Sequence, residues 1–166
     1  MLTQLVEIDI VPVMKLSNRG EYALRALLVL GLHYGEKVVP IHTISAEQNI
    51  PRKFLDHILS DLKQLGAVES DRGFRGGYRL ARPPEHITLA SVIRHLEGAM
   101  APVGCVSERF YQRCTCPNEA LCPIRDVMKE ARDGVVQLME RTTLADLIAR
   151  GQRLENPPPE PADYVI

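Results

Sequence analysis

The chain has 166 residues, of which 45% are hydrophobic and 25% charged, and its formal net charge is −1 at pH 7. This length suffices for one compact domain with a core, plus an additional element. No apolar run reaches the ~18 residues of a membrane span, and the N-terminus lacks the basic and apolar regions of a secretion signal. We therefore expect a cytosolic (cytoplasmic) protein whose four cysteines serve metal or redox chemistry rather than structural disulfides.

The charge is distributed unevenly along the chain. From Met14 to His86 there are 11 Lys and Arg against 8 Asp and Glu, whereas from Ile87 onward 9 oppose 11. A mildly basic front half joined to an acidic back half suits a DNA-binding module linked to something else. Residues 1–13 precede a second methionine, and we expect them to be a disordered extension or a start codon placed too early, without a function.

Three helices are predicted in the front half. Ser17 can cap a first helix that is apolar nearly all round, and is therefore central to the domain, and that ends at Gly35. A second helix covers roughly 41–48, and a turn leads into a third helix at roughly 51–65, with Pro51 as its first residue. The third helix divides into an apolar stripe and a separate polar face at helical spacing. The stripe comprises Phe54, Leu55, Ile58, Leu59, Leu62 and Leu65, and the polar face comprises Arg52, Lys53, Asp56, His57 and Ser60.

A glycine-rich hairpin is predicted next, with short strands near 68–71 and 78–80. Its tip carries Arg72 and Arg75, with Arg79 close behind. A helix, a short helix, a tight turn, an amphipathic helix and a basic hairpin form the layout of a winged helix-turn-helix. The polar face would then meet base edges in the major groove, and the arginines would enter the minor groove or neutralise phosphates. For the third helix taken alone, a merely solvated polar face is the alternative interpretation.

The back half is predicted to hold a fourth helix at roughly 88–97 and a long helix from Pro123 to about Arg141. A last short helix at 144–150 is capped by Thr143, and the Pro-rich segment after it is expected to be disordered. Residues of the long helix recur at spacings of 4 and 3, which is typical of a coiled-coil seam. This seam comprises Ile124, Met128, Ala131, Val135, Leu138 and Thr142.

Four cysteines lie between these two helices, spaced C-x8-C-x-C-x5-C: Cys105, Cys114, Cys116 and Cys122. Thiolates bind soft metals, and four of them can hold a 2Fe–2S or 4Fe–4S cluster. Structural zinc also takes four cysteines, but commonly as two C-x2–4-C pairs, which do not occur here. Reversible thiol oxidation is a third possibility. Either all four cysteines are ligands, or three are, with Glu108 or Glu119 as a stand-in.

Three segments carry a family resemblance: MKLSNRGEYALRALL, IPRKFLDHILSDLKQLGAVES and RGFRGGYRLARPPEHITL. They resemble the Rrf2 family of bacterial winged-helix regulators, which includes the iron–sulfur cluster regulator and the nitric-oxide-sensing repressor. The likeness covers roughly residues 14–150. It implies a homodimer on an imperfect DNA palindrome, with the long helix crossing to the partner and a cluster bound just before it. It also implies base reading by Lys53, Asp56 and His57, a minor-groove contact by Arg72, and contacts near the DNA backbone by Ser17, Arg19 and Tyr22.

The sequence thus predicts a mainly α fold with a small β-hairpin wing and a long C-terminal dimerisation helix. We divide it into a DNA-binding domain at 14–86, a connecting helix at 87–104, the cysteine loop at 105–122, the dimerisation and terminal helices at 123–150, and a tail at 151–166. The expected function is that of a DNA-binding transcription regulator, a repressor, whose iron–sulfur cluster is a removable brace.

The cluster would sense redox state, nitric oxide or iron supply. A zinc-stabilised or thiol-redox regulator is the alternative, and an iron–sulfur carrier without DNA binding is a remote one. An enzyme is disfavoured because the Walker, nucleophile-elbow and HExxH motifs are missing and the histidines are scattered without partners.

Overall fold

The structure is a computed structural model that describes residues 16–73 and 76–157. The expectations for residues 1–13, for Arg75 and for the tail from 158 onward lie outside the described residues. Helices dominate, with one antiparallel pair of strands. The elements are α1 (Asn18–Leu32), α2 (Ile41–Gln48), α3 (Arg52–Gln64), β1 (Val68–Asp71), β2 (Gly77–Leu80), α4 (Leu89–Glu97), α5 (Pro123–Arg141) and α6 (Leu144–Glu155), with short 3-10 turns η1 (Pro84–His86) and η2 (Gly104–Val106).

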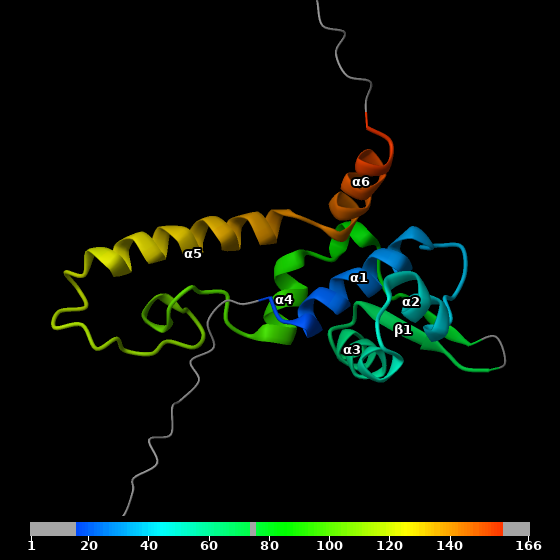
Figure 1. Cartoon of the computed structure of the whole chain (residues 1–166), viewed down its shortest axis with the longest axis horizontal. Helices are drawn as coiled ribbons and strands as arrows, with labels where there is room; N and C mark the ends of the chain where they lie inside the picture. Colours follow the sequence, from blue (N-terminus) through cyan, green and yellow to red (C-terminus); the bar gives the residue numbers. More distant parts are fainter. Residues whose placement is uncertain (1–15, 74–75, 158–166) are drawn as a thin grey trace, which may run out of the picture.

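Helix α1 lies at the centre of the N-terminal part, with α2, α3, α4, α6 and β2 packed around it (Figure 1). The Ser17 hydroxyl caps it by accepting a hydrogen bond from the Gly20 amide, as predicted. Its apolar residues are buried on several sides, which explains why its sequence shows no clear polar face. The core that it forms with its neighbours includes Leu27, Leu30, Ile44, Leu55, Leu59, Leu62, Ile87, Val92 and Leu144.

Local sequence signals set the boundaries between α2 and α3. Asn49 ends α2 in the left-handed conformation, with φ of 50°, which Asn tolerates better than most residues. Pro51 was predicted as the first helical residue of α3, but its ψ of 128° makes it the N-cap, and the helix begins at Arg52.

The β1–β2 hairpin is joined by a third stretch of backbone. Val39 pairs with Tyr78 through two hydrogen bonds of 2.8 and 2.9 Å. Gly77 makes this approach possible, because a Cβ atom there would lie 2.6 Å from the Val39 carbonyl oxygen. The second strand therefore begins at Gly77, one residue earlier than predicted.

Helix α5 extends away from the core as an arm, and the cysteine loop, residues 105–122, lies along it (Figure 1). The seam predicted for α5 is divided between two sides of the helix. Met128 packs against residues 101–106, whereas Ile124 and Leu138 are 68% and 42% exposed. Thr142 is buried at the end of the helix. The inner side of α5 is instead completed by Val136 and Met139, which pack on α4.

Backbone hydrogen bonds join the end of α5 to the start of α4. The Leu89 amide donates to the Thr142 carbonyl at 2.9 Å, and the Leu144 amide donates to the Ile87 carbonyl at 2.8 Å. Helix α6 then packs on α1 and continues to Glu155, five residues beyond the predicted end. No helix within residues 16–73 and 76–157 combines the length and apolar composition needed to cross a membrane.

Thr143 and Asp146 form the predicted capping box at the start of α6. The Asp146 carboxylate accepts from the Thr143 amide and hydroxyl, both at 2.8 Å, and the Asp146 amide donates back to the hydroxyl at 3.2 Å. We expect Thr143→Ala to lower the free energy of unfolding by about 1 kcal/mol, measured by urea denaturation. The exposed Ser60→Ala variant is the control, and equal losses in the two variants would contradict this role.

The same hydrogen bonds from Thr143 lower the pKa of Asp146. A lowered pKa in the folded state means that the ionised carboxylate stabilises the fold at pH values above its ordinary pKa. This stabilisation is lost as the pH falls through the lowered pKa. We expect Asp146→Asn to flatten the acid limb of a plot of unfolding free energy against pH, and an unchanged limb would rule the contribution out.

Candidate functional site

The outward side of α3 carries the predicted base-reading residues. Arg52, Lys53, Asp56 and His57 are all exposed, and we call them the recognition face. The opposite side of the helix is buried through Leu55, Ile58, Leu59 and Leu62. No residue within 16–73 or 76–157 forms an ion pair with a member of the recognition face. These donors and acceptors are therefore available to a partner.

Phe54 was predicted to belong to the buried stripe, and this was wrong. It lies at the edge of the stripe and is 59% exposed. Its ring lines a shallow apolar hollow of about 310 Å³ together with Tyr22, His57 and Ile58. Phe54 is thus part of the same surface as the recognition face. Its place in the sequence directly after Lys53 is the only signal that could have indicated this.

The hairpin places Arg72 in the exposed coil that follows β1. Arg79, which the sequence puts close to the tip, lies between two carboxylates instead. Its guanidinium is 2.6 Å from Glu69 and 3.2 Å from Asp71, and the hydrogen bond to Glu69 raises its pKa further. The positive charge of Arg79 is therefore largely compensated within the hairpin, whereas Arg72 has no such ion pair among the described residues.

Ser17 and Arg19, predicted to lie near the DNA backbone, make contacts within the protein. The Ser17 hydroxyl donates to Glu97 Oε1 at 2.6 Å. The Arg19 guanidinium binds Asp61 of α3 at 2.6 Å and the Leu96 carbonyl of α4 at 3.4 Å. We call these contacts the α1 clasp, because they hold the start of α1 to both α3 and α4. The Arg19 side chain remains 51% exposed, so part of it stays accessible to a ligand.

The four cysteines gather around the start of α5. Cys105 lies in η2 and is buried, Cys122 is the N-cap of α5, and Cys116 Sγ lies 3.8 Å from Cys122 Sγ. Cys114 packs against the cluster that contains Cys105. Within residues 16–73 and 76–157, no three Cys, His, Asp or Glu side chains converge on the position of a single metal ion.

The thiols differ in how readily they ionise. Hydrogen bonds with Cys114 and Cys122 raise the pKa of Cys116 to about 12. The backbone amide of Arg125, in the first turn of α5, lowers the pKa of Cys122. Burial raises the pKa of Cys105. An electron-rich sulfur set beside free helix amides fits a metal centre with thiolate ligands, because such a centre is anionic and accepts these hydrogen bonds.

Two arginines of α5 support the cysteine loop from below. Arg125 donates to the Cys105 carbonyl at 3.3 Å, and Arg132 donates to the Val106 carbonyl at 3.0 Å. The acidic residues considered as stand-in ligands pair with these arginines, Glu119 with Arg125 at 3.3 Å and Glu108 with Arg132 at 3.1 Å. Their first role in the structure is therefore to fix the loop to the helix.

Comparison with known proteins gives a consistent family. Residues 16–150 match the model of the Rrf2 family, described as iron-dependent transcriptional regulators. An rrf2-like HTH-type transcriptional regulator of Rhodobacter capsulatus is 36% identical, over 82% of this chain and 93% of the relative. The HTH-type transcriptional regulator NsrR of Halalkalibacterium halodurans is 30% identical, over 86% of this chain and 95% of the relative.

Solved structures agree with the sequence comparison. CymR, described as the global cysteine regulator of B. subtilis, superposes with a TM-score of 0.70 at 31% identity and covers 82% of this chain and 98% of its own. IscR of T. potens gives a TM-score of 0.67 at 25% identity, over 86% of this chain and 91% of its own. The predicted fold class, a winged helix-turn-helix with a long additional helix, is thereby confirmed, and the relatives are regulators rather than enzymes.

Proposed function

Because the chain belongs to the Rrf2 family of DNA-binding transcriptional regulators, we propose that it is a sequence-specific repressor controlled by an iron–sulfur cluster in the cysteine loop. The observation that carries the DNA-binding part is the exposed recognition face of α3 with Arg72 beside it. A helix of this width enters the major groove, where Lys and Arg bind guanine acceptors or phosphates and Asp accepts from a cytosine amino group. Arg72 and Arg75 then contact the minor groove or the phosphates.

Phe54 extends this interface. An aromatic ring at the edge of the recognition face can pack on a thymine methyl group, which the major groove presents at A·T pairs. The apolar hollow between Phe54 and Tyr22 offers the same ring a second position against α1. Phe54 therefore contributes apolar contact where its neighbours contribute charge.

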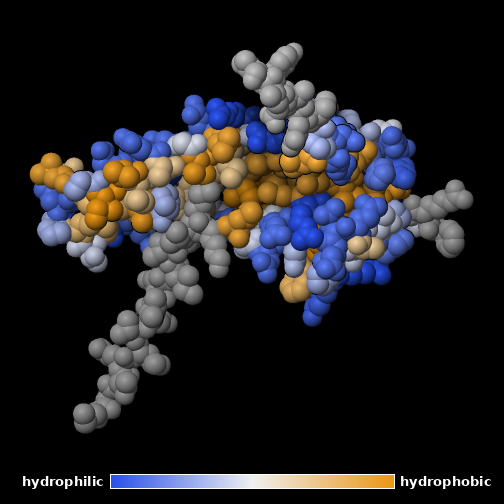
Figure 2. Space-filling model, turned by 45° about the horizontal axis from the view of Figure 1, so that its top comes forward, coloured by the Kyte–Doolittle hydropathy of each residue, from blue (hydrophilic) through white to orange (hydrophobic). Residues whose placement is uncertain are grey.

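The outer side of α5 supports a homodimer. Ile124, Val127 and Leu138 are 68%, 57% and 42% exposed, and Ala131 and Gly134 lie between them. These five residues recur at spacings of 3 and 4, and a Cβ atom at Gly134 would have open space around it. A second copy of α5 can therefore approach closely at the two small residues. Hydrophobic side chains are visible on the surface of this arm, on the left of Figure 2.

A symmetric pair of recognition helices suits an imperfect palindrome, because half-sites about one helical turn apart mirror the two-fold axis of the dimer. The test is to select binding sites from random duplex DNA and measure affinity by fluorescence anisotropy at several salt concentrations. We expect a dissociation constant of about 10⁻⁸–10⁻¹¹ M at physiological salt for the selected site. The logarithm of affinity should fall linearly with the logarithm of salt concentration. Equal affinity for selected and random DNA would contradict sequence-specific regulation.

The cysteine loop supports the sensory part of the proposal. Cys105, Cys114, Cys116 and Cys122 would hold the cluster, which supplies a centre that reacts with oxygen or nitric oxide. Tying these thiols together would fix the loop against α5. Phe110 of the loop lies against Gly98, where a Cβ atom would meet the ring at 3.0 Å. The next residue toward the N-terminus belongs to the α1 clasp, which ends on α3, so loop and recognition face are joined by continuous contacts.

Anaerobically purified protein provides the test of the sensory part. We expect visible absorption together with iron and acid-labile sulfide, and at least a tenfold difference in DNA affinity between cluster-bound and cluster-free protein at matched salt. Tenfold corresponds to about 1.4 kcal/mol of coupling. Equal affinity of the two forms would contradict control by the cluster and leave the DNA-binding proposal unaffected.

One observation favours thiol oxidation as a second candidate. The 3.8 Å between Cys116 Sγ and Cys122 Sγ is short enough for a disulfide after a small rearrangement. Two thiols would give up two electrons and two protons to an oxidant such as hydrogen peroxide, which becomes two waters. Protein without iron that reversibly loses two hydrogens in mass spectrometry, and changes DNA affinity in parallel, would establish this mode. Colourless protein containing zinc would instead indicate a structural metal.

A further inference from the structure

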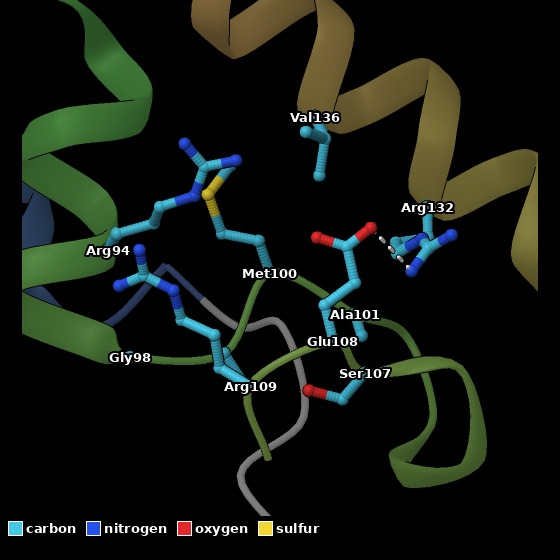
Figure 3. A pocket seen from close by; sticks show the side chains of 10 residues that line it. Arg94, Gly98, Met100, Ala101, Ser107, Glu108, Arg109, Arg132 and Val136 are labelled. Carbon is cyan, nitrogen blue, oxygen red and sulfur yellow. Dashed lines mark ion pairs between the residues drawn. The ribbon is translucent and has the colours of Figure 1, made fainter. Parts of the chain in front are cut away.

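A cavity of about 210 Å³ lies between α4, the residues that lead into the cysteine loop, and α5. Three arginines from these three segments line it: Arg94 of α4, Arg109 of the loop and Arg132 of α5 (Figure 3). Glu108 is the one carboxylate in the lining, and Met100 and Val136 supply apolar wall. None of the four cysteines lines the cavity. We propose that this cavity binds a small oxyanion, either a phosphate group or a short dicarboxylate.

The charge in the cavity carries this proposal. Arg132 is only 11% exposed and is already held by Glu108 at 3.1 Å, by Asp133 at 2.6 Å and by the Val106 carbonyl. Arg94 is held by Glu140 at 2.6 Å. These contacts fix two guanidinium groups at the wall of the cavity.

Arg109 is the exposed third arginine. It forms no ion pair with any residue in 16–73 or 76–157. Three guanidinium groups therefore face a lining with one carboxylate, which leaves an excess of positive charge and of unused N–H donors. Planar guanidinium groups match the paired oxygens of carboxylates and phosphates.

The size of the cavity limits the ligand. It exceeds the ~30 Å³ that one water occupies in the liquid, yet it lies below the ~300 Å³ where sites for drug-sized molecules begin. A compact anion such as phosphate or succinate fits these limits. An anion there would connect α4, the loop and α5 at one point, independently of the thiols.

The test is isothermal titration calorimetry on the intact protein without DNA, at low ionic strength, with inorganic phosphate and with succinate as probes. We expect one anion to bind per chain. Arg109→Gln should weaken binding at least tenfold, and Glu108→Gln should strengthen it, because it removes the opposing charge. Arg153→Gln, an exposed arginine on α6 away from the cavity, should leave it unchanged.

The two probes distinguish phosphoryl from carboxylate ligands, because the tighter of them identifies the class. Absence of saturable binding of both anions to the intact protein would overturn the proposal. So would equal affinities in Arg109→Gln and Arg153→Gln. These results are independent of DNA binding and of cluster content, so a failure here and a failure of the proposed function are distinguishable.

Discussion

Replacing both Lys53 and Arg72 by alanine is expected to weaken binding to the selected DNA site by a factor of a hundred or more. Both side chains are exposed, and neither forms an ion pair within the described residues. Losing a base-contacting Arg or Lys costs about 1–3 kcal/mol, and each lost phosphate contact reduces the salt slope by about 1. Because the two residues lie on different elements, α3 and the hairpin, their effects should be nearly additive.

Fluorescence anisotropy at matched salt provides the measurement. The control is the Lys129→Ala/Arg153→Ala double variant, which removes the same charge from exposed positions on α5 and α6. Circular dichroism and sedimentation should show that the helices and the oligomeric state are unchanged in both. Wild-type affinity in the Lys53 and Arg72 variant would mean that α3 and the hairpin do not form the interface.

The second large effect is expected from the cysteines. Cys105→Ser and Cys122→Ser should each reduce iron content to less than a tenth of wild type and remove the visible absorption. Cys105 is the buried thiol at the inner end of the loop, and Cys122 is the N-cap of α5 where helix amides favour a thiolate. Both belong to the ligand set whether three or four cysteines bind the cluster. Full iron content in either variant would contradict the cluster site.

Cys114→Ser and Cys116→Ser decide between the two ligand sets. Loss of iron in both variants establishes four cysteine ligands, and retention in one of them establishes three. A readout besides colour is DNA affinity, which should match that of cluster-free wild type in every variant that loses iron. The protein must be handled anaerobically throughout, because oxidation of the close Cys116 and Cys122 pair would imitate the loss.

Boundaries marked by proline, asparagine or glycine could be predicted from the sequence. Helices α2 and α5 occupy the predicted ranges, since Asn49 ends one and Pro123 begins the other. Helix α6 runs further than predicted because Gly151 lies within the helix instead of ending it. Helical periodicity located the recognition face correctly but did not show which side of the stripe edge Phe54 occupies.

Contacts between distant segments could not be predicted. The seam on α5 was read as one surface, but residues 98–106 and α4 cover part of it, and only folding brings them there. The α1 clasp joins Ser17 to Glu97, 80 residues apart, through side chains that have no shared motif. The same applies to Arg79, whose carboxylate neighbours follow from the hairpin register rather than from its position near the tip.

The backbone hydrogen bonds between the ends of α4 and α5 turn the long helix into a lever. Its base is pinned near Thr142 by main-chain bonds, and Cys122 lies at its free end. The 19 residues of α5 span about 28 Å, so a rotation of about 5° at the base displaces the cysteine end by about 2.5 Å. Read in reverse, tightening or releasing the sulfur ligands over atomic distances requires only a slight pivot next to α4, the helix that the clasp ties to α3.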